Sequence, residues 1–200
     1  MSILKFLFTC LLCLVVVSIV LVSAIGLFLY LTNRQSVNEE AQAIGGIAKS
    51  IILTSPAFEN DSFLPGKYTK ISPPLTWKNI PADTKSLVII ATDFDAPSPK
   101  LKLFSPTHWV VFNISPQTNS IEEGVKLEAF PPAKFGKNIL NQNAYTGPNP
   151  PFGVHNYTFR IYATTLDYIN PPNPTKEQIL KLISSKTIAY GEIVGKYGKE

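Results

Sequence analysis

A single long apolar segment dominates the hydrophobicity pattern of the 200-residue chain. Residues 6–31 carry no charge, and only Thr9, Ser18, Ser23 and Gly26 among them are not hydrophobic. At 1.5 Å per residue this segment extends over about 39 Å, enough to cross a hydrocarbon core of about 30 Å with some tilt. The pattern predicts one membrane-spanning helix and excludes a polytopic membrane protein.

The first residues are typical of a secretory signal or a signal anchor, because a short basic start ending at Lys5 precedes the apolar segment. The small residues Ser23 and Ala24 offer a cleavage site, but the apolar segment continues beyond them and is longer than an ordinary signal core. We therefore favour an uncleaved anchor over a removed signal peptide for residues 1–31. We expect the rest of the chain to be exported, either anchored to the membrane or secreted after cleavage.

The polarity changes after the apolar segment. Residues 32–48 are polar, then small, and contain the pair Gly45-Gly46. Such a composition predicts a flexible linker. Residues 49–200 then remain for one domain, which is long enough to bury a hydrophobic core.

The domain shows short hydrophobic runs bounded by proline or glycine, as is typical of strands. The runs predicted to be strands are residues 51–53, 86–91, 109–114, 157–163 and 188–194. One helix is predicted near the end, where Thr175 and Gln178 fit a capping box and apolar residues follow at helical spacing. We expect a mainly β domain, an antiparallel β-sandwich with one or two short helices.

Composition and charge narrow the classes of function. All 17 prolines follow residue 31, which excludes a coiled coil or a long helical bundle. The net charge is only +4 and the lysines are scattered singly, so the chain lacks the concentrated basic face of a nucleic-acid-binding protein. Both cysteines, Cys10 and Cys13, lie in the apolar segment, which leaves the domain without thiol or disulfide chemistry.

The candidate chemistry concentrates at the ends of the predicted strands. Asp93 and Asp95 follow one strand, and the only two histidines, His108 and His155, each open another. A histidine beside a carboxylate tends to stay protonated, so two imidazolium ions with the hydroxyl of Tyr157 would form a donor set for phosphate or carboxylate. The spacing alone leaves open that the aspartates only stabilise a turn and that each histidine is structural.

Five ordered segments resemble one known family. They are residues 71–77 (ISPPLTW), 93–97 (DFDAP), 108–113 (HWVVFN), 147–157 (GPNPPFGVHNY) and 193–198 (IVGKYG). Together they are similar to the phosphatidylethanolamine-binding protein family, and most closely to its bacterial and archaeal Raf-kinase-inhibitor-like branch. The resemblance spans nearly the whole domain.

The resemblance implies a large antiparallel sheet and a small pocket for anions such as phosphate, acetate or phosphoethanolamine. Carried over by motif, the pocket residues are Asp93, Asp95, His108, Gly147, Pro148, Pro151, His155 and Tyr157. In this picture both histidines and Tyr157 contact the anion, the aspartates orient and charge the histidines, and Gly147 and the prolines shape the rim.

Three departures from the family pattern affect the pocket. Phe94 stands where the family usually has the proline of Asp-Pro-Asp, and Asn156 stands where it usually has the arginine of His-Arg-Tyr. The helix that borders the pocket in eukaryotic members at their carboxyl terminus also has no counterpart before Glu200, which predicts a more open site.

The leading hypothesis is non-enzymatic binding of a small anion, a phospholipid head group or a phosphorylated partner, without a cofactor. One alternative is inhibition of a kinase or protease through protein contacts, which would require a protein partner; a homodimer also stays open. Another is a metal site or an acid–base hydrolase built from the same residues, although no Gly-x-Ser-x-Gly nucleophile motif occurs. The expected membrane contact is through residues 6–31.

Overall fold

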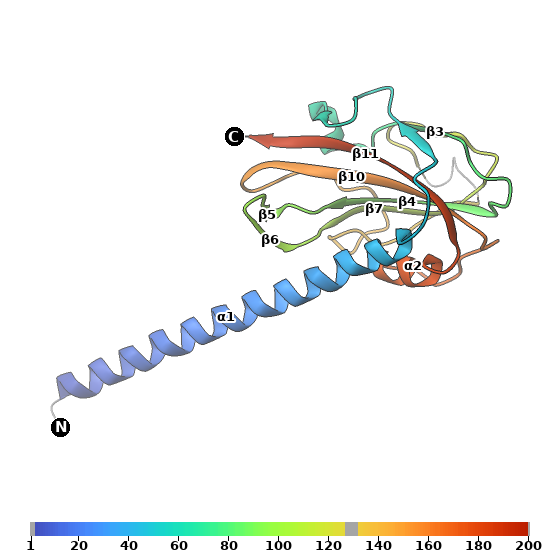
Figure 1. Cartoon of the computed structure of the whole chain (residues 1–200). Helices are drawn as coiled ribbons and strands as arrows, with labels where there is room; N and C mark the ends of the chain where they lie inside the picture. Colours follow the sequence, from blue (N-terminus) through green and yellow to red (C-terminus); the bar gives the residue numbers. More distant parts are fainter. Residues whose placement is uncertain (1–2, 127–131, 200) are drawn as a thin grey trace.

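A computed structural model describes residues 3–126 and 132–199 as a long helix leading into a β-rich domain (Figure 1). The helices are α1 (Ile3–Ile44), the 3-10 helix η1 (Gly66–Thr69) and α2 (Lys176–Ile183). The strands are β1 (Ile52–Thr54), β2 (Ser62–Phe63), β3 (Leu75–Lys78), β4 (Ser86–Asp93), β5 (Ala96–Ser98), β6 (Leu101–Phe104), β7 (Thr107–Ile114), β8 (Ser120–Ile121), β9 (Lys134–Phe135), β10 (Gly153–Thr164) and β11 (Thr187–Lys199).

A six-stranded sheet in the order β2-β11-β10-β4-β7-β9 forms the centre of the domain. Its long strands β4, β7, β10 and β11 pair antiparallel, as the sequence predicts. The edge strand β2 runs parallel to β11, so the sheet is mixed and not wholly antiparallel. This correction concerns a strand of two residues that the hydrophobicity pattern does not mark.

Both faces of the large sheet are covered, which explains the uninterrupted apolar run of β4. Leu87, Ile89 and Ala91 belong to a cluster on one face, together with Trp77 of the three-stranded sheet β1-β3-β8. Val88 and Ile90 belong to a second cluster on the other face, with α2 and the end of α1. A strand covered on both faces needs apolar residues at every position. The two-layer sandwich we expected is not established by these contacts and stays a prediction.

Helix α2 begins as the sequence indicates. The Thr175 hydroxyl accepts a hydrogen bond from the Gln178 amide, and the Gln178 side chain accepts one from the Thr175 amide, which completes the capping box. Ile179, Leu180 and Ile183 are fully buried on the second cluster. The capping box and the apolar spacing were therefore sufficient to locate this helix.

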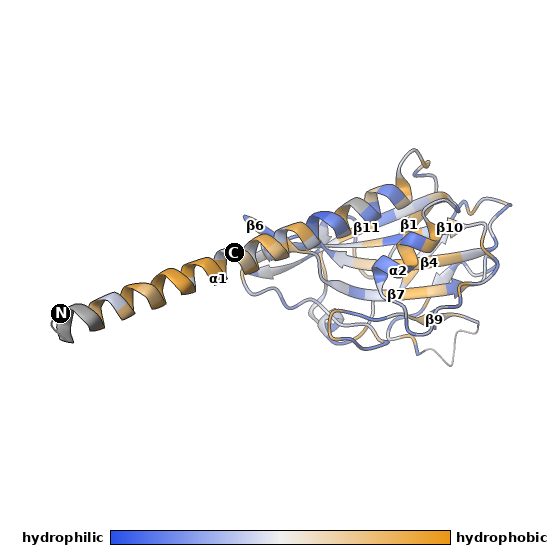
Figure 2. Ribbon diagram, turned by 90° about the horizontal axis from the view of Figure 1, so that it is seen from below, coloured by the Kyte–Doolittle hydropathy of each residue, from blue (hydrophilic) through white to orange (hydrophobic). Residues whose placement is uncertain are grey.

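Residues 32–44 differ from the flexible linker that we expected, because α1 continues through them to Ile44. This part of α1 packs on the domain: the Glu40 side chain pairs with Arg160 and Lys176, and Ala43 is fully buried. The helix ends where Gly46 adopts a φ of +74°. The hydropathy colouring of Figure 2 shows the change along α1 from apolar to mixed as it reaches the domain. In the part of the chain that the structure describes, one helix, Leu7–Ile44, is long and apolar enough to cross a membrane.

Candidate functional site

Adjacent strands of the large sheet bring the predicted site residues to one end. Asp93 is the last residue of β4 and lies opposite Tyr157 of β10 in the antiparallel register. His108 lies at the start of β7, the other neighbour of β4. Side chains on one face of paired strands lie close together, so the sheet itself assembles the site.

A cavity of about 250 Å³ lies at this end of the sheet. It is lined by Asp93, Ala96, Phe104, Pro106, His108, Ile139, Leu140, Thr146, Gly147, Asn149, Pro150, Pro151 and Tyr157. Five of the eight predicted residues are therefore in its wall, whereas Asp95, Pro148 and His155 are not. Phe104, Ile139 and Leu140 had no distinguishing pattern in the sequence.

His155 lies behind the cavity wall and supports Asp93. Its side chain is fully buried, with Nδ1 2.7 Å from the Asp93 Oδ2 atom and Nε2 3.0 Å from the Phe152 carbonyl oxygen. These two contacts hold the ring in one orientation behind the wall. His155 is thus a positioning residue for Asp93, and the direct contact with an anion that we expected is not available to it.

Asp95 also acts away from the cavity. Its Oδ2 atom accepts hydrogen bonds from the amide and the side chain of Asn156, and its Oδ1 atom is 2.6 Å from the Lys102 ammonium. Burial acts to raise the pKa of Asp95, but the Lys102 and Asn156 contacts outweigh it and hold that pKa below its usual value. Asp95 therefore joins β10 to the hairpin of β5 and β6 and orients neither histidine. Asn156, which replaces the usual arginine, is its partner.

His108 departs from the expectation of a second imidazolium ion. Burial lowers its pKa, which hydrogen bonding to the Thr146 and Gly147 backbone and the charge of Asp93 only partly offset. Its Nδ1 atom is 2.8 Å from the Thr146 carbonyl oxygen, so Nδ1 carries the proton of the neutral ring. His108 is consequently a neutral group in the cavity wall that can take up a proton.

Tyr157 lines the same cavity, and its hydroxyl interacts with Asp93. Burial, followed by the neighbouring Asp93 carboxylate, raises its pKa, so the phenol stays protonated over the physiological range. Its ring meets the His108 ring edge-on at 5.0 Å between centroids. These two side chains therefore bring a phenol hydroxyl and a titratable ring to the wall of the same cavity.

The loop that forms the rim is held by backbone packing. A Cβ atom at Gly147 would lie 2.2 Å from the Thr69 carbonyl oxygen, so only glycine fits there. The Tyr145 hydroxyl donates to the Tyr68 carbonyl oxygen at 2.8 Å, and the Thr146 amide donates to the His108 carbonyl oxygen at 2.9 Å. These contacts fix the rim against η1 and β7.

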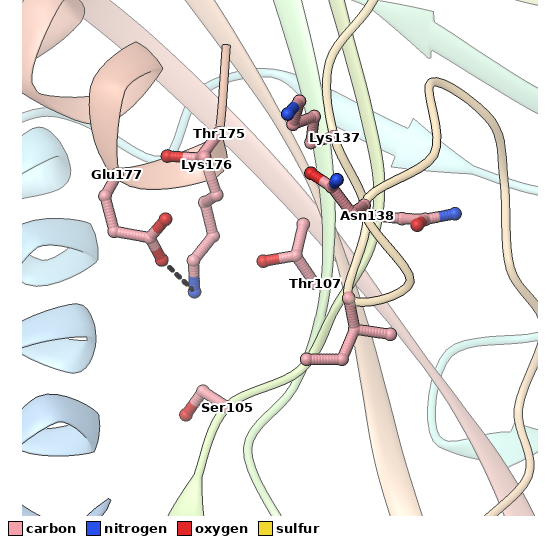
Figure 3. A pocket seen from close by; sticks show the side chains of 9 residues that line it. Ser105, Thr107, Lys137, Asn138, Thr175, Lys176 and Glu177 are labelled. Carbon is pink, nitrogen blue, oxygen red and sulfur yellow. Dashed lines mark ion pairs between the residues drawn. The ribbon is translucent and has the colours of Figure 1, made fainter. Parts of the chain in front are cut away.

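A second cavity of about 280 Å³ lies where α2 and the start of β7 approach α1 (Figure 3). The Lys176 ammonium in its wall could attract an anion, but Glu40 pairs with this ammonium at 2.8 Å and Glu177 lies 4.0 Å from it. A lysine already neutralised in this way offers little to an anion. Among residues 3–126 and 132–199, no group of three or more histidine, cysteine, aspartate or glutamate side chains is arranged to hold a metal ion.

Comparison with known proteins identifies similar chains. The model of a family described as phosphatidylethanolamine-binding protein matches residues 54–198. A protein named UPF0098 protein from Methanothermobacter thermautotrophicus is 39 % identical over 153 residues, covering 72 % of this chain and 97 % of its own length. Another UPF0098 protein, from Archaeoglobus fulgidus, is 40 % identical over 160 residues, covering 76 % of this chain but only 53 % of its own length.

Solved structures give the same result. A proposed phosphatidylethanolamine-binding protein homologue from Chlamydia trachomatis superposes with a TM-score of 0.68 at 34 % identity, covering 76 % of this chain and all of its own. E. coli YbcL, described as a member of the mammalian family, also has a TM-score of 0.68, at 22 % identity over 76 % of this chain and 99 % of its own. At 22 % identity, the likeness to YbcL is evidence for the fold of this chain and for nothing further.

Proposed function

We propose, for a chain that belongs to the phosphatidylethanolamine-binding protein family, that the cavity beside Asp93, His108 and Tyr157 binds a small anionic ligand. Phosphate, phosphoethanolamine, a phospholipid head group and a phosphorylated partner share the required chemistry. The role is binding, and we assign no reaction to the site.

The pairing of Asp93 with His155 is the observation that carries this proposal. An isolated carboxylate in the cavity wall would repel an anion, but Asp93 is held by the His155 ring, with 2.7 Å between Nδ1 and Oδ2. Proton uptake by His108 adds one positive charge to the cavity wall. An anion would favour that protonated form, so binding and proton uptake are coupled.

The proposal also places the domain at a membrane. The apolar part of α1, residues 6–31, would be an uncleaved anchor with the domain on the exported side, in keeping with the one helix among the described residues that is long and apolar enough to span a membrane. The family match begins at residue 54, so α1 is a feature outside the matched region.

Calorimetric titration of the full chain in lipid nanodiscs with inorganic phosphate tests the binding site. Tyr157→Phe removes the hydroxyl donor and keeps the ring, and it should weaken binding by about 1.5–3 kcal/mol, the usual value for a hydrogen bond to a charged group. Tyr190→Phe on β11 is the matched control because its side chain does not line the cavity. Absence of binding to the unchanged chain, or equal affinity of the two variants, would contradict the proposal.

A further inference from the structure

The helix α1 contacts the domain immediately after its apolar segment ends. The Asn33 side-chain amide donates to the Lys102 carbonyl oxygen at 3.1 Å, and the Ser105 hydroxyl donates to the Asn33 side-chain oxygen at 2.5 Å. Asn33 follows Leu31 by two positions, a rise of about 3 Å along the helix. Measured along the axis of α1, strand β6 therefore lies at the same height as the end of the segment proposed to cross the membrane.

A buried ionic cluster fixes the rest of the docked helix. The Glu40 carboxylate lies 2.8 Å from the Lys176 ammonium and 2.6 Å from the Arg160 guanidinium, and it accepts a hydrogen bond from Thr92. Phe94 lies against both cations, with ring-centre distances of 5.4 Å to Arg160 and 5.9 Å to Lys176. The residue that replaces the family's proline thus packs beside the contact between α1 and the domain.

Exposed apolar side chains lie at the same end of the domain. Leu101 opens β6 and is 52 % exposed, although its neighbour Lys102 is bonded to Asn33. Phe152 is 69 % exposed, and the adjacent Gly153 lies against Pro99 between β5 and β6. Figure 1 shows the β5–β6 hairpin at the side of the domain from which α1 departs. Large apolar side chains that are this exposed beside a membrane-spanning helix can be buried in the lipid around that helix.

The hairpin is also part of the anion cavity. Ala96 of β5 and Phe104 of β6 both line it, and Asp95, just before β5, ties the hairpin to β10 through Asn156. The segment that is held level with the end of the apolar helix therefore forms one wall of the binding site. Lys100, at the hairpin turn, is exposed and adds a positive charge there.

We propose that Leu101 and Phe152 insert into the surface of the same bilayer that α1 crosses, so that the cavity is held beside its lipid head groups. This inference rests on the proposed anchor role of α1 and specifies where the domain acts. The occupant of the apolar surface is the lipid of that membrane, because the hydrogen bonds of Asn33 set its height relative to α1. An interfacial side chain of this kind is buried about 5–10 Å below the head-group boundary.

Tryptophan fluorescence of the full chain in vesicles of brominated lipid tests this placement. Leu101→Trp introduces an exposed reporter, whereas the native Trp77 and Trp109 are buried and their signal is subtracted using the unchanged chain. Ile52→Trp is the matched control, since Ile52 is 51 % exposed but lies in β1, beyond the docked part of α1. Phe152→Trp serves as the reporter if circular dichroism shows that Leu101→Trp is misfolded.

We expect the reporter at Leu101 to lose about half or more of its emission in brominated vesicles, as a side chain inserted at the interface would, and the control to keep its emission. Equal emission of reporter and control in vesicles that retain the protein on flotation would overturn the inference. Loss of the protein from the floating vesicles would overturn it together with the anchor. Phosphate titration of the same samples reports the cavity separately, so a failure of the anion proposal is recognised by itself.

Discussion

Replacing Glu40 by glutamine should strongly destabilise the contact between α1 and the domain. Glu40 is 2 % exposed, and its carboxylate is 2.8 Å from Lys176 and 2.6 Å from Arg160. Arg160 keeps Glu192 at 2.8 Å, but Lys176 is fully buried and retains only Glu177 at 4.0 Å. Removing one partner of a buried ion pair costs about 3–5 kcal/mol, because the other charge stays buried without compensation.

Chemical denaturation of the full chain in detergent micelles, followed by circular dichroism, measures this loss. Glu59→Gln is the matched control because the exposed Glu59 makes the same charge change outside the cluster. In the double variant Glu40→Gln with Lys176→Met, the uncompensated ammonium is absent, and about 1–3 kcal/mol should be regained. The docked helix should also become sensitive to protease between residues 32 and 44.

The reasoning would be refuted if Glu40→Gln lost no more than about 0.5 kcal/mol relative to Glu59→Gln, the range of ordinary surface substitutions. It would equally be refuted if the double variant were as unstable as the sum of the two single variants. In either case Glu40 would not hold α1 on the domain, and a flexible connection would again be the better description.

Two further predictions concern the site itself. Gly147→Ala should lower stability by about 1–3 kcal/mol in thermal unfolding, since the new Cβ would lie 2.2 Å from the Thr69 carbonyl oxygen, whereas Gly66→Ala meets no atom within 4 Å and should be nearly neutral. The pKa of His108 is lowered in the folded state, so folding resists protonation of this ring. The neutral ring should therefore contribute stability above the unfolded pKa of 6.5, and this contribution should be lost as the pH falls below that value toward the lower pKa of the folded state. His108→Gln should flatten that part of the stability profile; an unchanged profile would show that another group causes it.

The local sequence pattern was sufficient to predict the elements whose structure depends on neighbouring residues. The continuous run at residues 86–91 predicted a strand covered on both faces, and the Thr175–Gln178 spacing located α2. The motifs also predicted that Asp93, His108 and Tyr157 share one pocket. All three line one cavity in the structure, because antiparallel pairing places the ends of adjacent strands side by side.

Contacts between distant residues could not be predicted in this way. Residues 32–44 have the polarity of a linker, and they are helical in the structure because Glu40 meets Arg160 and Lys176, which lie 120 and 136 positions further along the chain. The charge of His108 depends on its burial, which the neighbouring carboxylates in the sequence do not reveal. The lining residues Ile139 and Leu140 likewise reach the cavity only through the folded path of their loop.

Titration with sulfate at several pH values tests the central claim most directly, since sulfate keeps its charge over the range of about pH 5 to about pH 8 in which histidine titrates. Coupling to one proton on His108 predicts that affinity rises as the pH falls, by up to about tenfold per pH unit, and that His108→Gln abolishes this dependence. An affinity that is constant over that range, or a pH dependence that survives in His108→Gln, would contradict an anion site charged by His108.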